Sequence, residues 1–273
     1  MSDELDLRGM RVGYGNPDPA GAGSAASGPS TAGAGSAASG PSTAGAGSAA
    51  SGPSTAGGPG TAGADGVADH LDPSWLTGDP PWLDLFRRWL VEAVDAKIPE
   101  PNAMVLGTVD EYGHPATRTV LCKGADADGI VFFTGYESAK GRQLAANPVA
   151  SVTFPWIALE RQVHFRGRVV KVDPAETADY WNARPRGSQL SARASNQSQP
   201  IGSRAALEAV AALVAAEFGG ADGDVPVPVP PHWGGYRLQP VSVEFWQGRA
   251  DRLHNRAIAV VDGDGWTVTR LQP

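Results

Sequence analysis

The sequence is poor in the residues that build covalent cross-links and metal centres. Cys122 is the single cysteine among 273 residues. This excludes an intrachain disulfide and a cysteine-rich zinc site, and it favours a reduced, cytoplasmic protein. The five histidines show no spacing typical of metal ligands, so we expect no metal.

Long apolar runs and an excess of positive charge are also missing. No segment approaches the roughly 18–20 apolar residues that span a bilayer. The first residues lack the basic region and apolar run of a signal peptide. The formal net charge is -7, and residues 1–74 hold seven acids and two bases. The rest of the chain is close to neutral, so we expect neither a membrane nor nucleic acid as a partner.

The first quarter of the chain has little that could form a core. Residues 19–64 contain no charged or aromatic residue and no Leu, Ile, Val or Met, and they include GAGSAASGPSTA three times within 21–56. Such a segment cannot bury enough apolar surface to offset its ordering entropy. We predict a disordered segment over residues 1–74 and one folded domain over 75–273. A recognition tail is the alternative interpretation of the repeats.

Hydrophobic periodicity predicts a mainly β fold with peripheral helices. Expected strands cover 104–109, 117–121, 130–134, 149–154, 162–172, 236–238, 241–246, 257–261 and 266–271, and expected helices cover 82–93, 138–146, 174–183 and 203–218. The turn-rich connection at 110–113 suggests a hairpin. Strands and helices do not alternate strictly, which favours an antiparallel barrel over a doubly wound sheet.

No HExxH, GxSxG, P-loop or GxGxxG motif is present, so candidate chemistry lies in polar clusters beside β-prone segments. In the first cluster, Arg118 and Lys123 bracket a short apolar run. A phosphate grip and an exposed edge strand both remain open. Strand parity places the two side chains on opposite faces, unless a bulge brings them together.

The second and third clusters lie at helix ends. Residues 138–140 follow Thr134 and begin a predicted helix, whose N-terminus attracts anions. A Ser cap with a solvated Lys is the alternative. Tyr180 and Arg184 are neighbours on one helix face if the helix extends that far, and Ser188 lies just beyond. They predict a second phosphate site, or else a helix end whose dipole favours basic residues.

The fourth cluster follows an aromatic strand. Arg252, His254 and Arg256 share strand parity, so an extended segment would direct all three to one site near Trp246. A basic surface strand with a core tryptophan is the alternative. Together the four clusters suggest a ligand with two anionic ends.

At these residues the chain resembles the pyridoxamine 5'-phosphate oxidase family. The matching stretches are RTVLCK at 118–123, FPW at 154–156, ERQV at 160–163, YWNARPRGSQ at 180–189, NQS at 196–198, HWGGYRL at 232–238, EFWQG at 244–248 and RLHNR at 252–256. The resemblance covers residues 99–273 and the helix at 82–90. It implies an antiparallel, Greek-key-like, FMN-binding split β-barrel, and a homodimer whose subunits share the FMN sites.

The resemblance also implies roles for particular residues. FMN contacts are expected from Arg118, Thr119, Val120, Leu121, Cys122, Lys123, Phe133, Thr134, Lys140, Gln162, Gln197, Ser198, Trp246 and Arg256. Substrate contacts are expected from Lys123, Tyr180, Arg184 and Ser188 at the phosphate, and from Arg252, Leu253 and His254 at the pyridine ring. Arg252 and His254 are the expected catalytic residues. A weaker match at Arg11 and Tyr14 resembles a segment that closes over substrate.

The implied activity is FMN-dependent oxidation of pyridoxamine or pyridoxine 5'-phosphate to pyridoxal 5'-phosphate, with dioxygen as acceptor and hydrogen peroxide as product. A non-catalytic carrier of flavin or pyridoxal phosphate remains open, as does a split-barrel reductase that uses another flavin or a deazaflavin.

The chain departs from the family at Cys122, Phe133, Ala139 and Asn255, where Leu, Tyr, Arg and Asp are common. At Ala139 one charge-assisted hydrogen bond of about 1.5–3 kcal/mol is lost. We therefore expect FMN binding weakened by about tenfold to a hundredfold.

Overall fold

The computed structural model describes Leu7 and residues 71–273. The predicted disordered segment, Arg11 and Tyr14 therefore lie outside the described residues, apart from Leu7 and 71–74. The strands are β1 (Ala103–Val109), β2 (Pro115–Leu121), β3 (Gly124–Asp126), β4 (Gly129–Gly135), β5 (Val149–Trp156), β6 (Arg161–Lys171), β7 (Trp233–Gln247), β8 (Asn255–Asp262) and β9 (Gly265–Leu271). The helices are α1 (Leu83–Asp95), α2 (Ala139–Ala146), α3 (Pro174–Ala183), α4 (Arg186–Ala194) and α5 (Arg204–Glu217), with 3-10 turns η1 (Pro73–Trp75), η2 (Ile157–Leu159) and η3 (Ala250–Arg252).

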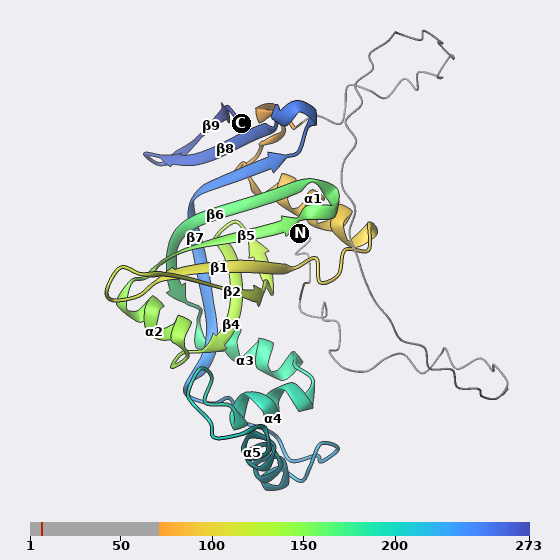
Figure 1. Cartoon of the computed structure of the whole chain (residues 1–273), viewed down its shortest axis with the longest axis vertical. Coiled ribbons are helices and arrows are strands. Elements are labelled where there is room, and N and C mark those ends of the chain that lie inside the picture. Colours follow the sequence, from red (N-terminus) through yellow and green to blue (C-terminus); the bar gives the residue numbers. More distant parts are fainter. Residues whose placement is uncertain (1–6, 8–70) are drawn as a thin grey trace, which may run out of the picture. The chain divides into compact units, whose positions relative to one another are not determined.

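The strands form one antiparallel sheet in the order β2-β1-β5-β6-β7-β4-β3, and β8 and β9 extend it from β7. Strand β6 pairs with β7 from end to end. On the other edge of β7, β4 pairs with its first half and β8 with its second half. The predicted mainly β, antiparallel fold with peripheral helices is confirmed (Figure 1).

Aromatic side chains fix α1 against the sheet. Phe86 of α1 meets Phe154 of β5 with ring centroids 4.9 Å apart and Phe165 of β6 with centroids 5.2 Å apart. Trp82 and Trp89 are buried beside them. Fully burying one such side chain contributes about 1.5–3 kcal/mol. The apolar stripe of the predicted helix therefore anchors the sheet that carries the site.

Strand β7 corrects the expectation of two short strands at 236–238 and 241–246. Proline lacks the N–H that a central strand needs, so Pro240 suggests a break. The strand instead continues through Pro240. The pairing of β6 with β7 shifts in register between Arg166 and Gly167, and Gly167 is the partner of Pro240. A Cβ on Gly167 would lie 1.9 Å from the carbonyl oxygen of Gln239, so glycine is what permits this close approach.

Helix α4 and strand β3 were not predicted. Pro185 and Gly187 suggest an irregular loop, but Pro185 is the N-cap of α4, where its φ of -54° suits the helix start. Strand β3 has only three residues, Gly124–Asp126, too few for a periodic signal.

Candidate functional site

Three candidate residues meet at the N-terminus of α2. Lys140 Nζ donates to Thr134 Oγ1 at 3.2 Å and to Gln197 Oε1 at 3.2 Å, and Thr134 Oγ1 donates to Gln197 Oε1 at 2.8 Å. Thr134 belongs to β4, Lys140 to the first turn of α2, and Gln197 to the loop after α4. These hydrogen bonds connect the second predicted cluster to Gln197, which lies some sixty positions further along the chain.

Local sequence explains why α2 starts at this point. Ser138 has extended backbone, and its Oγ accepts a hydrogen bond from the N–H of Gly141 at 3.2 Å, as an N-cap does. A Cβ at Gly141 would lie 2.1 Å from the carbonyl oxygen of Tyr136. Glycine therefore lets the first turn of α2 pack directly on the end of β4. This close packing places Lys140 beside Thr134.

Arg118 of β2 adds a second cation to this group. Its guanidinium donates to Gln143 Oε1 at 2.8 Å and to the hydroxyl of Thr108. Burial, and then the charge of Arg118, lower the pKa of Lys140 to about 8. Neither cation has a carboxylate partner among the described residues. Two partly buried cations without a counter-ion, beside a helix N-terminus, suit an anion such as a phosphate.

An aromatic group lies next to these cations along β4. The ring of Phe133 stacks on Tyr180 at a centroid distance of 4.0 Å and an angle of 22°. Trp233 stacks on Phe133 at 5.6 Å, and Arg184 lies over the Trp233 ring at 4.7 Å. Because Phe133 and Thr134 are consecutive in a strand, their side chains point to opposite faces. The first half-site is defined as these residues: Arg118, Thr134, Lys140, Gln197, Phe133, Tyr180, Trp233 and Arg184.

The third predicted cluster comes together, although α3 is shorter than that cluster requires. The helix ends at Ala183, and Arg184 is its C-cap with extended backbone. Arg184 Nη2 nevertheless donates to the carbonyl oxygen of Ser188 at 2.9 Å. A turn between α3 and α4, and not one helix face, therefore brings Tyr180, Arg184 and Ser188 to one region.

Of the first predicted cluster, Arg118 lies in a strand and Lys123 lies beyond its end. Strand β2 ends at Leu121, so strand parity does not relate Arg118 to Lys123. Lys123 is buried, and its backbone N–H donates to Val131 of β4 at 2.8 Å. Cys122 is fully buried, and its thiol donates to the carbonyl oxygen of Gly124 at 3.3 Å. Burial raises the pKa of this thiol to about 12, which makes it a poor nucleophile.

Three further candidates lie in one row across the C-terminal part of the sheet. Gln162 of β6 and Arg256 of β8 are both register partners of Trp246 of β7. Arg256 Nε donates to Glu244 Oε1 at 2.7 Å. The imidazole of His254 lies 4.7 Å from the Trp246 ring. Gln162, Trp246, His254 and Arg256 are called the second half-site.

The expected extended segment through the fourth cluster is wrong. Residues Ala250–Arg252 form a 3-10 turn, and Asp251 and Arg252 have φ values of 56° and 61°. Arg252 and Leu253 are exposed, whereas Arg256 belongs to β8. The three basic residues therefore do not share strand parity, and the turn itself presents Arg252 and Leu253 to solvent.

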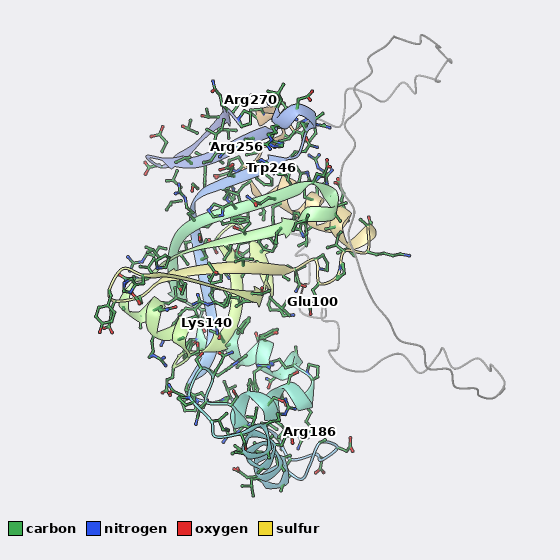
Figure 2. All side chains as sticks on the ribbon, viewed as in Figure 1. Glu100, Lys140, Arg186, Trp246, Arg256 and Arg270 are labelled. Carbon is green, nitrogen blue, oxygen red and sulfur yellow. The ribbon has the colours of Figure 1, made fainter. Side chains whose placement is uncertain are left out.

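The two half-sites lie at opposite ends of β7 (Figure 2). Thr134 pairs with Gly234, and Gln162 pairs with Trp246, twelve positions further along the same strand. At about 3.3 Å per residue this corresponds to roughly 40 Å along the strand. The two half-sites of one chain are therefore separated along β7.

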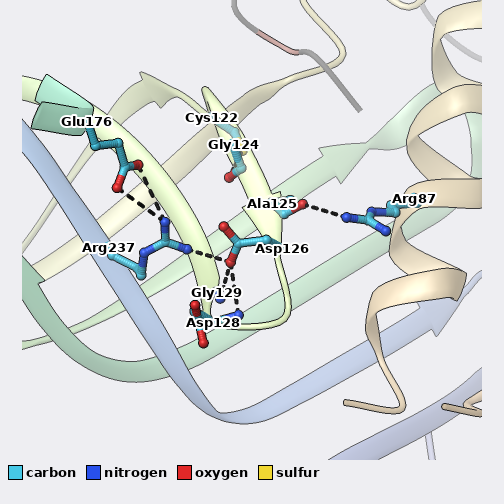
Figure 3. A network of polar contacts seen from close by, with 9 residues as sticks. All are labelled: Arg87, Cys122, Gly124, Ala125, Asp126, Asp128, Gly129, Glu176 and Arg237. Atoms are coloured by element: carbon cyan, nitrogen blue, oxygen red, sulfur yellow. Dashed lines mark hydrogen bonds and ion pairs between the residues drawn. The ribbon is translucent and has the colours of Figure 1, made fainter. Parts of the chain in front are cut away.

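A polar network fixes the helix that carries Tyr180 (Figure 3). Arg237 of β7 forms an ion pair with Asp126 beside the β3–β4 turn and another with Glu176 of α3 at 3.4 Å. Glu176 and Tyr180 are four residues apart on α3 and share a helix face. The ion pairs therefore tie the face that carries Tyr180 to β7.

A separate cavity of about 230 Å³ lies beside β1 and β2, and of the expected site residues it includes Thr119. The described part of the chain contains no group of three or more His, Cys, Asp or Glu that could hold a metal ion. It contains no helix long and apolar enough to cross a membrane.

Comparison with known proteins assigns the family. Residues 90–217 match the family model described as pyridoxamine 5'-phosphate oxidase, and residues 233–273 match the pyridoxine 5'-phosphate oxidase C-terminal dimerisation region. The chain is 57% identical to a pyridoxine/pyridoxamine 5'-phosphate oxidase of Rhodococcus jostii over 214 residues, which cover 77% of this chain and 93% of that protein. The chain belongs to the pyridoxine/pyridoxamine 5'-phosphate oxidase family. The predicted resemblance is thereby confirmed.

Other members of this family and its fold support the assignment. The oxidase of Nocardia farcinica is 54% identical over 217 residues, which cover 78% of this chain and 94% of that protein. The crystal structure of PhzG from Burkholderia lata, in complex with tetrahydrophenazine-1-carboxylic acid, is 34% identical with a TM-score of 0.69 and covers 75% of this chain and 98% of that one. A pyridoxamine 5'-phosphate oxidase-related, FMN-binding protein from Nostoc punctiforme shares the fold at a TM-score of 0.57 and 20% identity, covering 71% and 97%.

Sequence reasoning missed several residues that the fold of this oxidase family brings to the half-sites. Gln143 and Thr108 hold Arg118, but isolated polar residues in a helix and a strand carry no signal of this role. Trp233 and Glu244 lie within the HWGGYRL and EFWQG stretches. Both stretches carry the family resemblance, so they were the signal that could have drawn attention to these two residues.

Proposed function

We propose that the protein oxidises pyridoxamine 5'-phosphate and pyridoxine 5'-phosphate to pyridoxal 5'-phosphate, with FMN as cofactor and dioxygen as acceptor. The main observation in support is the pair Lys140 and Arg118, two cations without a carboxylate partner in the described chain. A second group, Tyr180 and Arg184 with the Phe133 and Trp233 rings, lies on the other face of β4. The two groups suit two phosphate-bearing molecules, such as a phosphorylated substrate and a flavin mononucleotide.

The residues of the first half-site fit the phosphate end of FMN. Lys140 and Arg118 supply positive charge, and the N-terminus of α2 adds the positive end of its dipole. Thr134 and Gln197 orient the Lys140 amine through their oxygens. When bound, FMN supplies the redox chemistry by accepting a hydride equivalent from substrate and passing the electrons to dioxygen.

The protein's own task is to bind and orient the substrate. Lys123, Tyr180, Arg184 and Ser188 are proposed to hold its phosphate, and Arg252, Leu253 and His254 its ring. His254 Nδ1 accepts a hydrogen bond from the backbone N–H of Arg249 at 3.1 Å. This bond requires Nδ1 to be unprotonated, so the neutral ring carries its proton on Nε2. His254 can therefore donate a hydrogen bond from Nε2 toward a ring substituent of the substrate.

A homodimer completes the proposed site. The C-terminal residues 233–273 match a dimerisation region, and they contain Trp246, His254 and Arg256. The separation of the half-sites along β7 supports an FMN site that combines the first half-site of one chain with the second half-site of its partner. Gln162 and Trp246 would then face the flavin from the partner chain.

Flavin bleaching without oxygen tests the function. We expect purified protein, reconstituted with FMN, to be yellow and to lose its flavin absorbance when pyridoxamine 5'-phosphate is added anaerobically. Air should restore the colour and release hydrogen peroxide, because dioxygen is the proposed acceptor. Flavin binding without bleaching would contradict the oxidase and support a carrier. Bleaching by a nicotinamide or deazaflavin donor, and not by the phosphorylated substrate, would support a reductase.

A further inference from the structure

Trp233 has no role among the residues implied by the family resemblance. It nevertheless packs against Tyr180 of α3 and Arg184, the C-cap of α3, which are both proposed to hold the substrate phosphate. The Arg184 guanidinium carbon lies 4.7 Å from the Trp233 ring centroid. The Tyr180 ring is nearly parallel to the Trp233 ring, at 6.2 Å and an angle of 10°. Phe133 stacks on both rings, at 4.0 Å from Tyr180 and 5.6 Å from Trp233.

The Trp233 ring is held rigidly. It is 7% exposed and belongs to a small buried cluster with Trp181, Leu190, Phe218 and Val227. Trp181 packs against it edge-on at 4.8 Å and 66° and is itself fixed by a 2.7 Å hydrogen bond from its Nε1 to the carbonyl oxygen of Val227. Trp233 is also the first residue of β7 and pairs with Gly135 of β4. The sheet and this cluster therefore set the position of the ring.

Arg184 is the C-cap of α3, with extended backbone, so its side chain leaves the helix end. Its guanidinium also lies over the Trp181 ring at 5.4 Å, further than from the Trp233 ring. The Ser188 carbonyl oxygen orients one nitrogen, and the face of Trp233 attracts the whole cation. Tryptophan gives the strongest cation–π attraction of the aromatic residues. An arginine that is already oriented loses less conformational freedom when an anion binds.

We propose that Trp233 is a positioning residue for the substrate phosphate and acts through Arg184 and Tyr180. This inference rests on the proposed function, which assigns the phosphate to those two residues. Trp233 itself does not touch the reacting atoms. Its effect should therefore appear in the binding of phosphorylated substrate and not in the chemical step.

Variants of Trp233 and two substrates test the proposal. We expect Trp233→Leu to raise the KM for pyridoxamine 5'-phosphate by about tenfold and Trp233→Phe by about threefold, with kcat within about twofold of wild type. The kcat/KM for pyridoxamine, which lacks the phosphate, and the Kd for FMN should stay within about twofold. Equal losses with both substrates would overturn the proposal, because a merely structural role predicts them.

Two controls make the outcome specific. The first control is Trp75→Leu, which removes a tryptophan that lies under Arg88 at 5.2 Å and outside both half-sites. The KM for pyridoxamine 5'-phosphate and the KM for pyridoxamine should then stay at their wild-type values. Adding Trp233→Leu to Arg184→Ala should raise KM little beyond the single Arg184 variant, whereas fully additive losses would contradict action through Arg184. If Trp233→Leu does not fold, the KM of Trp233→Phe decides, and an unchanged value refutes the proposal.

The result separates this inference from the proposed function. Wild-type protein that never reacts with pyridoxamine 5'-phosphate would refute the function itself. Active wild-type protein whose Trp233 variants match Trp75→Leu would refute the positioning role and leave the function intact.

Discussion

At the scale of single residues, burial determines what the cations of the first half-site can do. Lys140 is 7% exposed, and its charge is disfavoured by burial and by the neighbouring Arg118. Its pKa therefore falls to about 8, close to the pH at which most enzymes are assayed. An arriving phosphate dianion would favour the charged amine. At the proposed FMN site, affinity should therefore depend on pH through this residue.

We expect FMN to bind most tightly below pH 8 and progressively more weakly above it. Below its pKa of about 8 Lys140 is already charged, whereas above that pH FMN binding must take up a proton. The Kd for FMN should then rise by up to about tenfold per pH unit. Fluorescence titration between pH 7 and pH 10 measures this. The matched variant Lys140→Arg keeps its charge, so its Kd should stay flat; a slope that persists in that variant would exclude Lys140 as the titrating group.

Which residues stand out as candidates was the part of the candidate site that depended least on the fold. Arg118, Thr134, Lys140, Tyr180 and Arg184 were all named from short motifs, because cations and hydroxyls beside strands stand out in an otherwise apolar sequence. Their partners were less predictable. A contact such as that from Lys140 to Gln197 joins residues far apart in the chain, and it depends on where the loop after α4 folds back.

At the scale of elements, β7 organises the site, and its length could not be derived from the sequence. Pro240 suggests that two strands meet there, whereas one strand of fifteen residues continues through it. The irregularity lies in the pairing, at Arg166 and Gly167 of β6. Helix α4 was missed for a similar reason, since Pro185 and Gly187 oppose helix in isolation but suit a helix start. Hairpins and amphipathic helices, whose signals are local, were predicted well.

We predict that Gly167→Ala destabilises the protein by about 2–4 kcal/mol. The added Cβ would lie 1.9 Å from the backbone oxygen of Gln239, so the two central strands must separate. Urea unfolding with the same spectroscopic probe gives the free-energy difference. The control is Gly187→Ala in α4, where nothing lies within 4 Å of the new Cβ. It should be neutral or stabilising by up to about 1 kcal/mol. Equal stabilities of the two variants would contradict the close approach of β6 and β7.

At the scale of the whole molecule, the two half-sites are separated along β7, and the proposed homodimer is what would bring them together. Lys140 lies near the start of β7, and Trp246 and Arg256 lie near its end (Figure 2). Arg184 lies over the ring of Trp233, the first residue of β7. The resemblance predicted a homodimer whose subunits share the FMN sites. It did not predict which candidate residues lie at which end of β7, because motif order along a chain carries no distance. The division becomes visible only when β4 and β8 are placed on the two halves of one strand.

Mixed dimers test this division. Arg184→Ala impairs the first half-site and Arg256→Ala the second, so each variant alone should lose most of its activity. If each complete site combines two chains, a mixed dimer holds one site with both defects and one intact site. Random assembly makes half of the dimers mixed, so co-expression should restore about a quarter of wild-type activity. Sites built within single chains would give no recovery.

The matched control combines two defects of the same half-site. Dimers of Arg184→Ala with Lys140→Ala contain no intact first half-site in either chain, so co-expression should leave activity as low as in the separate variants. Recovery in this pair would point to some other effect of co-expression, such as improved folding. Recovery confined to the Arg184 and Arg256 pair would show that residues from the two ends of β7 act together across subunits, because Gly234 and Trp246 lie twelve residues apart on one continuous strand.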